Sequence, residues 1–598
     1  MAVANKVRMI NFLYKILTEE RKNLVSYQYD HKPVFPQQEL QAPFLSSTPQ
    51  KEGITNLQVK AFFETVKTSD GINLHGVKVI KNGKSIVDMT YNPYEKAIWN
   101  TTHSLSKTVV ALAVGMAIQE GYFSVHDSVY EIIKGKSNFF TGNMIRRLTV
   151  QHLLTMTSGV NFREAGIIAT NNWSDAFLSA EFLFPPGTAF QYNSMNTYML
   201  AKILFMTTGK TLMEYLTPRL FAPLGLTNIA WEKGPEGFEK AGWGMYMPLD
   251  AMAKLGQFVL QRGSWLIGGK MVQLVAKEWM DDMLYPHEQE TGHREAYGYQ
   301  IWIEPNQRYY CFSGLFGQTI YINPKHHLVV AVTAGNNDIF SNEQFIQLIE
   351  QKFCTEEKKM TQQTDLSDEA LAAYLAEQKY CHYPQLSFLL ENQPTTFFEK
   401  VQQFFSSKKQ VQEKRIDEYV PSTILNTVYT FDNNCIGILP VIIQMMNDNF
   451  AQGLERVSFY QNANQLFLSW QEAGIKLDIP LGLYEPQKMK ININNELFLI
   501  ATSVDFATDE DDNFVIKASI CFLETSSERT LKFFFMNKTN TLKIECDECP
   551  SVSYLTSTVL SQFGNSDLQN FLGKDSGYLN FLITRLANPQ IMGKEQQE

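Results

Sequence analysis

The sequence predicts a mixed α/β (α+β) chain with two folded parts, an antiparallel sheet flanked by helices and then a separate, mostly-β part. Strand-like runs occur near residues 77–89 and again between 297 and 333, with a long helix-patterned region between them. That order indicates one antiparallel sheet built from both ends, with a helical lobe inserted. A second series of strand-like runs between 475 and 535 predicts a barrel or curled sheet.

Length, composition and charge narrow the class of protein. The chain has 598 residues, too many for one hydrophobic core, so two or three domains are expected. Its 44% hydrophobic and 19% charged residues are typical of globular proteins. A formal net charge of -10, without a dense Lys/Arg block, argues against general nucleic-acid binding. The 7 scattered cysteines predict reduced thiols.

No targeting or membrane segment is expected. The stretch from Met1 to Lys22 alternates apolar and charged side chains and lacks the unbroken apolar core of a signal peptide. No run approaches the roughly twenty apolar residues that span a bilayer. We therefore expect a cytoplasmic protein without an integral membrane span. An amphipathic helix at Val7–Leu17 is expected to pack on the main domain.

Changes in composition divide the chain. Charge and Gln/Ser content rise between 356 and 415, which we interpret as a connector with helical patches at Asp368–Gln378 and Phe397–Phe405. Strands are expected beyond it at Ile475–Ile479, Leu497–Ala501, Phe514–Leu523 and Leu531–Phe535. The expected parts are an N-terminal extension (1–45), a sheet-and-helix domain (46–355), the connector (356–415), a β-rich domain (416–555) and a helical C-terminal tail (556–598).

Local patterns place the elements of the first domain in order. A helix is expected from Ser47 to about Thr68. Val77–Ile80 and Ser85–Met89 flank the turn sequence Lys81-Asn82-Gly83-Lys84, which is a β-hairpin signal. Apolar periodicity and stop signals predict the remaining elements: helices from Ser104 to Gly121, over Leu148–Gly159, from Thr197 and over Leu249–Leu260, and strands at Tyr297–Ile303, Tyr309–Phe312, Gly317–Ile322 and Leu328–Thr333.

A chemically suggestive pattern lies where a polar run meets a buried helix. Ser104 stands near the first turn of that helix, and Lys107 follows three residues later on the same helical face. A hydroxyl becomes a nucleophile when a neighbour removes its proton, and burial favours the neutral, proton-accepting form of a lysine. The structural alternatives are a helix-capping serine and a surface lysine. Ser406–Lys409 repeats the spacing in a polar stretch and is expected to be solvated surface.

Several further stretches, in the same order as in a known family, give this pattern its context. They are Ser47–Ile54, His103–Thr108, Leu148–Gly159, the Pro-Pro-Gly-x-x-Phe-x-Tyr run of Pro185–Ser194, Gly242–Gly244 with Asp250–Gly256, and Gly314–Gln318 with Pro324. Together they resemble the serine β-lactamase and penicillin-binding-protein-like hydrolases, especially the class C, esterase and 6-aminohexanoate-oligomer-hydrolase branch. The resemblance covers roughly residues 45–340 and implies the β-lactamase-like fold.

The resemblance also implies roles for three residues. Ser104 would be the acyl-accepting nucleophile, and Lys107 would accept or relay its proton. Tyr192 would act beside Lys107, as a phenolate or as a proton carrier to the leaving group. A core aromatic with a satisfied hydroxyl is the structural alternative for Tyr192.

Two other parts of the family pattern are altered or open. Ser194 stands where many relatives have Asn, and its hydroxyl offers fewer hydrogen bonds than an amide; Asn193 could substitute only if the backbone differs. At the third family box, Phe312 stands where the family has a basic residue, which counts against true β-lactam hydrolysis. Gly314 and Gln318 are expected to support the site, with the Ser104 N–H and one nearby strand N–H forming an oxyanion hole.

The sequence therefore predicts a metal-free, cofactor-free serine hydrolase that acts on an ester or amide through an acyl-enzyme. The expected partner is a small-molecule or peptide-like substrate. The altered third box leaves open a non-catalytic binding or scaffold protein on the same fold. A hydrolase of cell-wall peptides is a narrower alternative that the missing export signal opposes. The physiological substrate, the oligomeric state and the role of residues 356–598 stay open.

Overall fold

The computed structural model describes residues 32–36, 38, 43–133, 142–162, 167, 170–337, 342–355, 365–379, 415–432, 434, 436–447, 449–551 and 589–596. These residues fall into two compact units. The first contains the described residues up to Leu375, apart from 91–93. The second contains 91–93 and the described residues from Ala376 onward.

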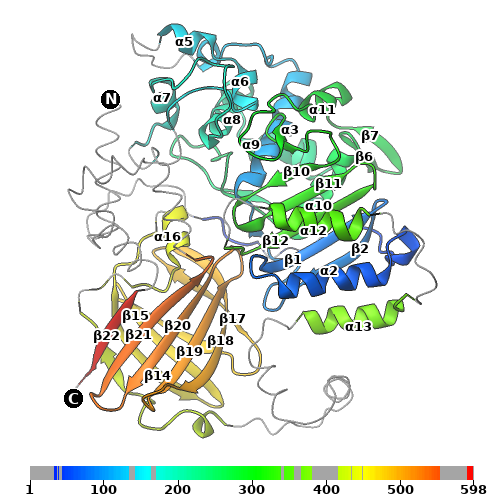
Figure 1. The fold of residues 1–598 in the computed structure, drawn as a ribbon. Helices are drawn as coiled ribbons and strands as arrows, with labels where there is room; N and C mark the ends of the chain where they lie inside the picture. The colour runs from blue at the N-terminus through cyan, green and yellow to red at the C-terminus, as the bar shows by residue number, and fades with distance from the viewer. Residues whose placement is uncertain are drawn as a thin grey trace. The chain divides into compact units, whose positions relative to one another are not determined.

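A seven-stranded antiparallel sheet forms the centre of the first unit, in the order β2-β1-β12-β11-β10-β9-β8 (Figure 1). Its strands are β1 (Leu74–Lys81), β2 (Lys84–Thr90), β8 (Ala296–Tyr297), β9 (Trp302–Ile303), β10 (Tyr310–Ser313), β11 (Thr319–Asn323) and β12 (Leu328–Ala334). Because β1 pairs with β12, the first and last strands lie side by side. The prediction of one sheet built from both ends is confirmed.

The predicted hairpin at the start of this sheet is also confirmed. Asn82 and Gly83 both adopt positive φ, at 53° and 77°. Two consecutive positive φ angles belong to the tight turn whose twist suits antiparallel strands, and Asn-Gly adopts it readily. The turn brings Lys81 opposite Lys84 and pairs β1 with β2.

Helices cover both faces of the sheet. On one face α10 (Leu249–Leu260) packs so closely that a Cβ on Gly256 would lie 2.5 Å from Val329 and 2.6 Å from Ile320. On the other face, α2 (Asn56–Thr68) and α12 (Glu343–Phe353) pack through ring contacts of Phe62. The residues of β12 are accordingly all buried. The amphipathic pattern predicted α10 with the correct bounds.

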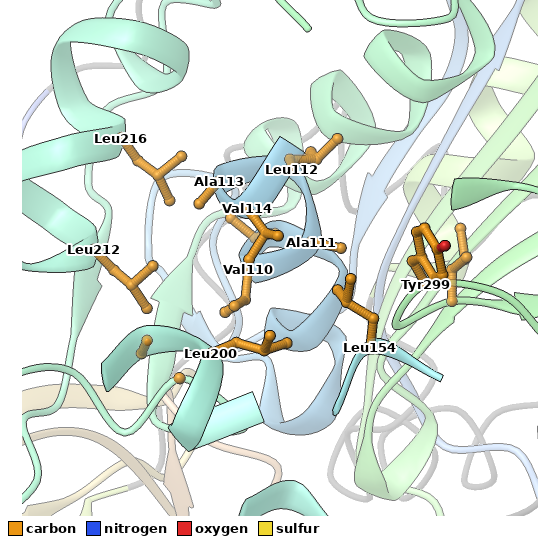
Figure 2. Packing of buried hydrophobic residues seen from close by; sticks show 14 of the residues in the cluster. Val110, Ala111, Leu112, Ala113, Val114, Leu154, Leu200, Leu212, Leu216 and Tyr299 are labelled. Atoms are coloured by element: carbon orange, nitrogen blue, oxygen red, sulfur yellow. The ribbon is translucent and has the colours of Figure 1, made fainter. Parts of the chain in front are cut away.

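The helical lobe is built around α3 (Ser106–Gln119), which is buried from Ser106 to Ala117. Figure 2 shows its Val110–Val114 segment among Leu154, Leu200, Leu212, Leu216 and Tyr299. Gly121 adopts φ 82° after the helix, as its predicted stop requires. The other helices of this region are α4 (Val129–Ile133), α5 (Gly142–Arg147), α6 (Val150–Leu154), α7 (Trp173–Leu178), α8 (Ser194–Thr208), α9 (Leu212–Leu216) and α11 (Lys277–Met283).

Small strands lie beside the helical lobe. A three-stranded sheet contains β3 (Asn100–Thr101), β5 (Met245–Met247) and β4 (Ala230–Trp231), and a hairpin contains β6 (Ser264–Ile267) and β7 (Lys270–Gln273). β3 ends directly before the turn that carries Ser104. Its pairing with β5 therefore fixes the start of that turn.

Several predicted boundaries are wrong, each for a local reason. The helix expected from Ser47 begins at Asn56, because Thr55 and Gln58 form a capping box there. The helix expected to reach Gly159 ends at Leu154. The single strand expected over Tyr297–Ile303 is two short strands, since Gln300 between them has φ 58°.

The second unit is one curled, ten-stranded antiparallel sheet (Figure 1). Its order is β16-β15-β14-β13-β22-β21-β20-β19-β18-β17. The strands are β13 (Val428–Thr430), β14 (Leu454–Asn462), β15 (Gln465–Glu472), β16 (Ile475–Leu481), β17 (Gln487–Ile493), β18 (Glu496–Thr508), β19 (Phe514–Phe522), β20 (Glu528–Met536), β21 (Thr541–Cys549) and β22 (Gln590–Glu595). Gly482, just after β16, bonds to the backbone of Thr502 and Val504 in β18, so the two ends of the strand order nearly meet. The predicted separate β part is confirmed.

The interior of this sheet is largely apolar and contains a buried ion pair. β20 alternates partly exposed and buried residues along its length, as a sheet with one interior face requires. Arg529 is 1% exposed and forms an ion pair with Glu548. The Glu548 carboxylate also accepts the backbone N–H of Val441 at 3.0 Å, at the start of α16 (Val441–Asn447). The ion pair thus ties this helix to strands β20 and β21.

Near the chain end, the expected helical tail over 556–598 is wrong for residues 590–595. These form strand β22 in the middle of the sheet, where it pairs with β13 and β21.

The predicted helical patch Asp368–Gln378 is confirmed as α13 (Asp368–Gln378). The helices expected at Val7–Leu17 and Phe397–Phe405 lie outside the described residues. Within the described part of the chain, no helix is both long and apolar enough to cross a membrane.

Candidate active site

Ser104 lies in a short 3-10 turn, His103–Leu105, immediately before α3. The backbone N–H and the hydroxyl of Thr102 both donate to the carbonyl of Met245 in β5, at 2.9 and 3.0 Å. The N–H of Leu105 donates back to Thr102 at 3.2 Å and closes the turn. Ser104 is partly exposed, whereas Ser106 and Lys107 behind it are buried. The hydroxyl therefore stands at the accessible mouth of a buried helix, as predicted.

Lys107 is buried, and three oxygens surround its amine. The amine lies 2.9 Å from the Ser104 hydroxyl, 2.8 Å from the Ser194 hydroxyl and 2.8 Å from the carbonyl of Gly242. A carbonyl can only accept a hydrogen bond, whereas each hydroxyl can accept or donate one. The surface-lysine alternative is excluded by an exposure of 1%.

Ser194 and Tyr192 come from the loop that leads into α8. Ser194 is the first residue of that helix, and it faces Lys107. Asn193 is the N-cap: its side-chain oxygen accepts the N–H of Met195, and its amide nitrogen donates to Val160 and Phe162. Asn193 is thus committed to the helix start, and Ser194 is the residue that reaches the lysine.

The ring centre of Tyr192 lies 4.9 Å from the Lys107 amine. This distance allows a cation–π contact whenever the amine is charged. Trp302 stacks on Tyr192 at 5.8 Å with an interplanar angle of 14°, and Tyr297 meets it edge-on at 6.2 Å. Burial, with a smaller effect of Tyr192, raises the pKa of Tyr297. The structure therefore brings Ser104, Lys107, Tyr192 and Ser194 together.

His103 precedes the serine in an unusual backbone conformation, with φ 50°. Its ring packs edge-on against Phe316, 5.2 Å away, and Phe316 itself has φ 62°. Burial, followed by the charge of Lys107, lowers the pKa of His103 to about 4. Two non-glycine residues in the left-handed region thus meet beside Ser104, which is where backbone strain often gathers at functional sites.

The end of β10 approaches the serine turn from the other side. A Cβ on Gly314 would lie 2.3 Å from the Thr102 carbonyl oxygen, so only glycine fits against this turn. Among the described residues, no hydrogen-bond acceptor is found for the N–H of Ser104 or of Leu315. Both residues are partly exposed, so these two N–H groups are available to a ligand.

Gln318 and Phe312 face inward from this hairpin. Gln318 is fully buried and donates to the Ala334 carbonyl at 2.6 Å, so it supports the hairpin and does not face solvent. Phe312 is fully buried in the core cluster that also contains Leu105. The third-box position therefore presents an apolar side chain to the core.

Two contributors could not be predicted from residue type alone. The Gly242 carbonyl is a backbone group, and only the Gly242-Trp243-Gly244 landmark pointed to its region. Trp302 was placed in a predicted strand without a role in the site. No group of three or more His, Cys, Asp or Glu side chains suited to a metal ion is found in the described residues.

Two features characterise this part of the protein. The fold is an antiparallel sheet flanked by helices, and the site is a Ser-x-x-Lys turn at the start of a buried helix. Residues 60–343 match the family model described as Beta-lactamase. The resemblance seen in the sequence is confirmed. The match supports a hydrolase in general terms.

Individual relatives are more distant. An uncharacterized protein of Alkalihalophilus pseudofirmus is 26% identical over 315 residues, which is 45% of this chain and 87% of that protein. A Bacillus anthracis protein provisionally named 6-aminohexanoate-dimer hydrolase is 20% identical, with a TM-score of 0.44, over 57% of this chain and 92% of that one. A family VIII carboxylesterase is 16% identical, with a TM-score of 0.41, over 50% of this chain and 98% of that one. A penicillin binding protein from Bacillus halodurans is 18% identical, with a TM-score of 0.39, over 49% of this chain and 100% of that one.

Proposed function

We propose that the protein is a serine hydrolase that cleaves an ester or amide through an acyl-enzyme on Ser104. The observation that carries the proposal is the buried amine of Lys107, 2.9 Å from the Ser104 hydroxyl, inside the region that matches the Beta-lactamase family model. A base at this distance can take the hydroxyl proton as the oxygen attacks a carbonyl carbon.

The surroundings of Lys107 suit the neutral amine. A neutral amine has two N–H donors and one lone pair. Gly242 must accept one N–H, and Ser194 can accept the other. The lone pair is then left for the proton of Ser104. These three neighbours can therefore orient Lys107 as a general base.

Tyr192 completes the proposed proton path. After attack, the Lys107 ammonium lies beside the Tyr192 ring, 4.9 Å from its centre. We infer that the Tyr192 hydroxyl carries the proton to the departing alcohol or amine, while Lys107 compensates the phenolate charge. Water would reverse the sequence in the second half of the reaction and release the acid.

The N–H groups of Ser104 and Leu315 are the proposed oxyanion hole. A tetrahedral intermediate places negative charge on the former carbonyl oxygen, and fixed N–H donors stabilise that charge. The short approach of Gly314 to Thr102 supports this pairing, because it draws the end of β10 to the serine turn.

The buried Phe312 bears on the substrate class. Phe312 is apolar and fully buried, so this position offers no cation to a substrate carboxylate. We therefore propose a substrate without a carboxylate next to the scissile bond: a small ester, a short amide oligomer or a peptide-like molecule. True β-lactams are disfavoured on this ground.

Phe312, which stands where the family has a basic residue, also favours the second candidate, a non-catalytic binding or scaffold protein on this fold. One experiment separates the two. Wild-type protein is treated with a fluorophosphonate probe, and the labelled peptide is identified by mass spectrometry. Labelling at Ser104 that is lost in Ser104→Ala and kept in Ser406→Ala, the other Ser-x-x-Lys serine, supports the hydrolase. No labelling of the wild type supports the scaffold.

A further inference from the structure

One buried side chain outside the site is hydrogen-bonded to three helices. Gln300 is 1% exposed and lies between β8 and β9. Its amide nitrogen donates to the carbonyls of Leu153 and Leu154 at the end of α6, both at 3.0 Å. Its amide oxygen accepts the hydroxyl of Thr197 in α8 at 2.6 Å. Its backbone carbonyl accepts the hydroxyl of Thr108 in α3 at 2.7 Å.

The helix contacts of Gln300 lie close to the reacting groups. Thr108 follows Lys107 directly on α3, and Thr197 lies three residues after Ser194 on α8. The Lys107–Ser194 hydrogen bond of 2.8 Å joins the same two helices. Gln300 therefore bonds to α3 within one turn of Lys107 and to α8 within one turn of Ser194.

The apolar packing between α3 and α8 does not by itself fix their relative position to a fraction of an ångström. Hydrophobic contact is non-directional, whereas hydrogen bonds have narrow distance and angle ranges. Gln300 also adopts φ 58°, which is unfavourable for a residue with a Cβ. The four hydrogen bonds above hold it in that conformation.

The same loop supports the third member of the site. Trp302, two residues after Gln300, stacks on Tyr192. The loop around Gln300 thus reaches α3 and α8 through hydrogen bonds and Tyr192 through ring packing. The loop that contains Gln300 therefore supports all three site residues, Lys107, Ser194 and Tyr192.

We propose that Gln300 is a positioning residue for the reaction: it holds α3 and α8 in the relative position that sets the Lys107–Ser194 hydrogen bond. This inference rests on the proposed function and adds a residue that does not touch the substrate. A misplacement of about 1 Å in such a site can lower a rate on the order of 100-fold. Loss of a Gln300 bond should therefore lower kcat and leave KM nearly unchanged.

The test uses matched pairs that remove or keep one hydroxyl in the full-length protein. Thr197→Val keeps the side-chain shape and removes the donor to Gln300, and Thr197→Ser keeps the donor. Thr108→Val and Thr108→Ser make the same comparison on α3. Thr207→Val is the control, because among the residues that the structure describes the Thr207 hydroxyl bonds only to carbonyls of its own helix, Ile203 and Leu204.

With an aryl ester as substrate, Thr197→Val should lower kcat roughly 10- to 100-fold with KM within about twofold. Thr197→Ser and Thr207→Val should stay within about threefold of the wild type. If Thr197→Val fails to fold, the Thr108 pair gives the same comparison. Unchanged kcat in the folded valine variants, or an equal loss in Thr207→Val, would overturn the inference.

A second readout does not depend on turnover. In a crystal structure of Thr197→Val, the distance between the Lys107 amine and the Ser194 hydroxyl should exceed 3.5 Å, the limit of a hydrogen bond. A retained distance of about 2.8 Å would reject the positioning role. Wild-type protein no more active than Ser104→Ala would contradict the proposed function instead, and the crystallographic distance would still decide the role of Gln300.

Discussion

The side-chain amine of Lys107 donates a 2.8 Å hydrogen bond to the backbone carbonyl of Gly242. Ser106, one residue earlier on α3, donates to the neighbouring carbonyl of Ala241 at 2.7 Å. Two consecutive backbone carbonyls thus hold the first turn of the helix that follows Ser104. The orientation of the proposed base depends on this segment.

Gly242→Ala should lower activity much more than stability. A Cβ at position 242 would lie 2.9 Å from both the Cβ and the carbonyl oxygen of Ser194, so Ser194 or Gly242 must move. Both accept hydrogen bonds from Lys107. We expect kcat to fall roughly 10- to 100-fold. Gly142→Ala is the control, because a Cβ there meets nothing within 4 Å; equal kcat values for the two variants would contradict this role of Gly242.

Acid should destabilise the first unit through His103. Its pKa is about 4 in the folded protein, below the ordinary value of 6.5, because burial disfavours the charged ring. As the pH falls below 6.5, the unfolded chain binds a proton that the folded protein does not, so stability is lost progressively down to about pH 4. Between pH 7.5 and pH 5 the loss should be about 2 kcal/mol.

His103→Asn removes this titration, and Asn tolerates the positive φ at that position. Urea unfolding of wild type and variant at pH 7.5 and pH 5 checks the prediction. The variant should lose about 2 kcal/mol less than the wild type between the two pH values. An identical pH dependence in both proteins would show that His103 is not the responsible group.

Phe312→Lys should destabilise the protein without creating recognition of carboxylates. The side chain is fully buried in the core, so a lysine would bring an uncompensated charge into apolar surroundings. The expected cost is roughly 3 kcal/mol or more, with Phe312→Leu costing about 1 kcal/mol. Thermal unfolding measures both. A stable lysine variant that gains β-lactam hydrolysis would refute the interpretation of this position.

In the second unit, Arg529→Met should cost about 3 kcal/mol, because it leaves the buried Glu548 without its cation. Arg529→Met combined with Glu548→Gln should recover part of that loss. Hydrogen exchange of the β20 and β21 amides measures the effect. Lys543→Met, which removes a more exposed ion pair with Glu545, is the control and should cost roughly 0.5 kcal/mol or less. Equal effects of Arg529→Met and Lys543→Met would contradict this account.

Much of the first unit was predictable, because its elements carry strong local signals. Local structure is specified by the amphipathic pattern of α10, by the turn sequence Asn82-Gly83 and by Gly121, which ends α3. The break between β8 and β9 was not predictable, because the positive φ of Gln300 depends on hydrogen bonds to three helices that are distant in sequence. β22 was missed because a short polar strand gains its stability from its partners β13 and β21.

The residues of the candidate site likewise divide into those that the sequence predicts and those that it does not. Ser104 and Lys107 were predictable because their spacing places both on one helical face. The approach of Tyr192 followed only from the family resemblance, since 85 residues separate it from Lys107. The Gly242 carbonyl and the Leu315 N–H belong to the backbone, and residue type carries no signal for them.

The labelling rate of Ser104 tests the central claim most directly. Intact-protein and peptide mass spectrometry should show one fluorophosphonate adduct on Ser104 in the wild type. In Lys107→Met the rate of adduct formation should fall on the order of 100-fold or more, because the base is gone. Labelling at another residue, or an unchanged rate in Lys107→Met, would contradict the account.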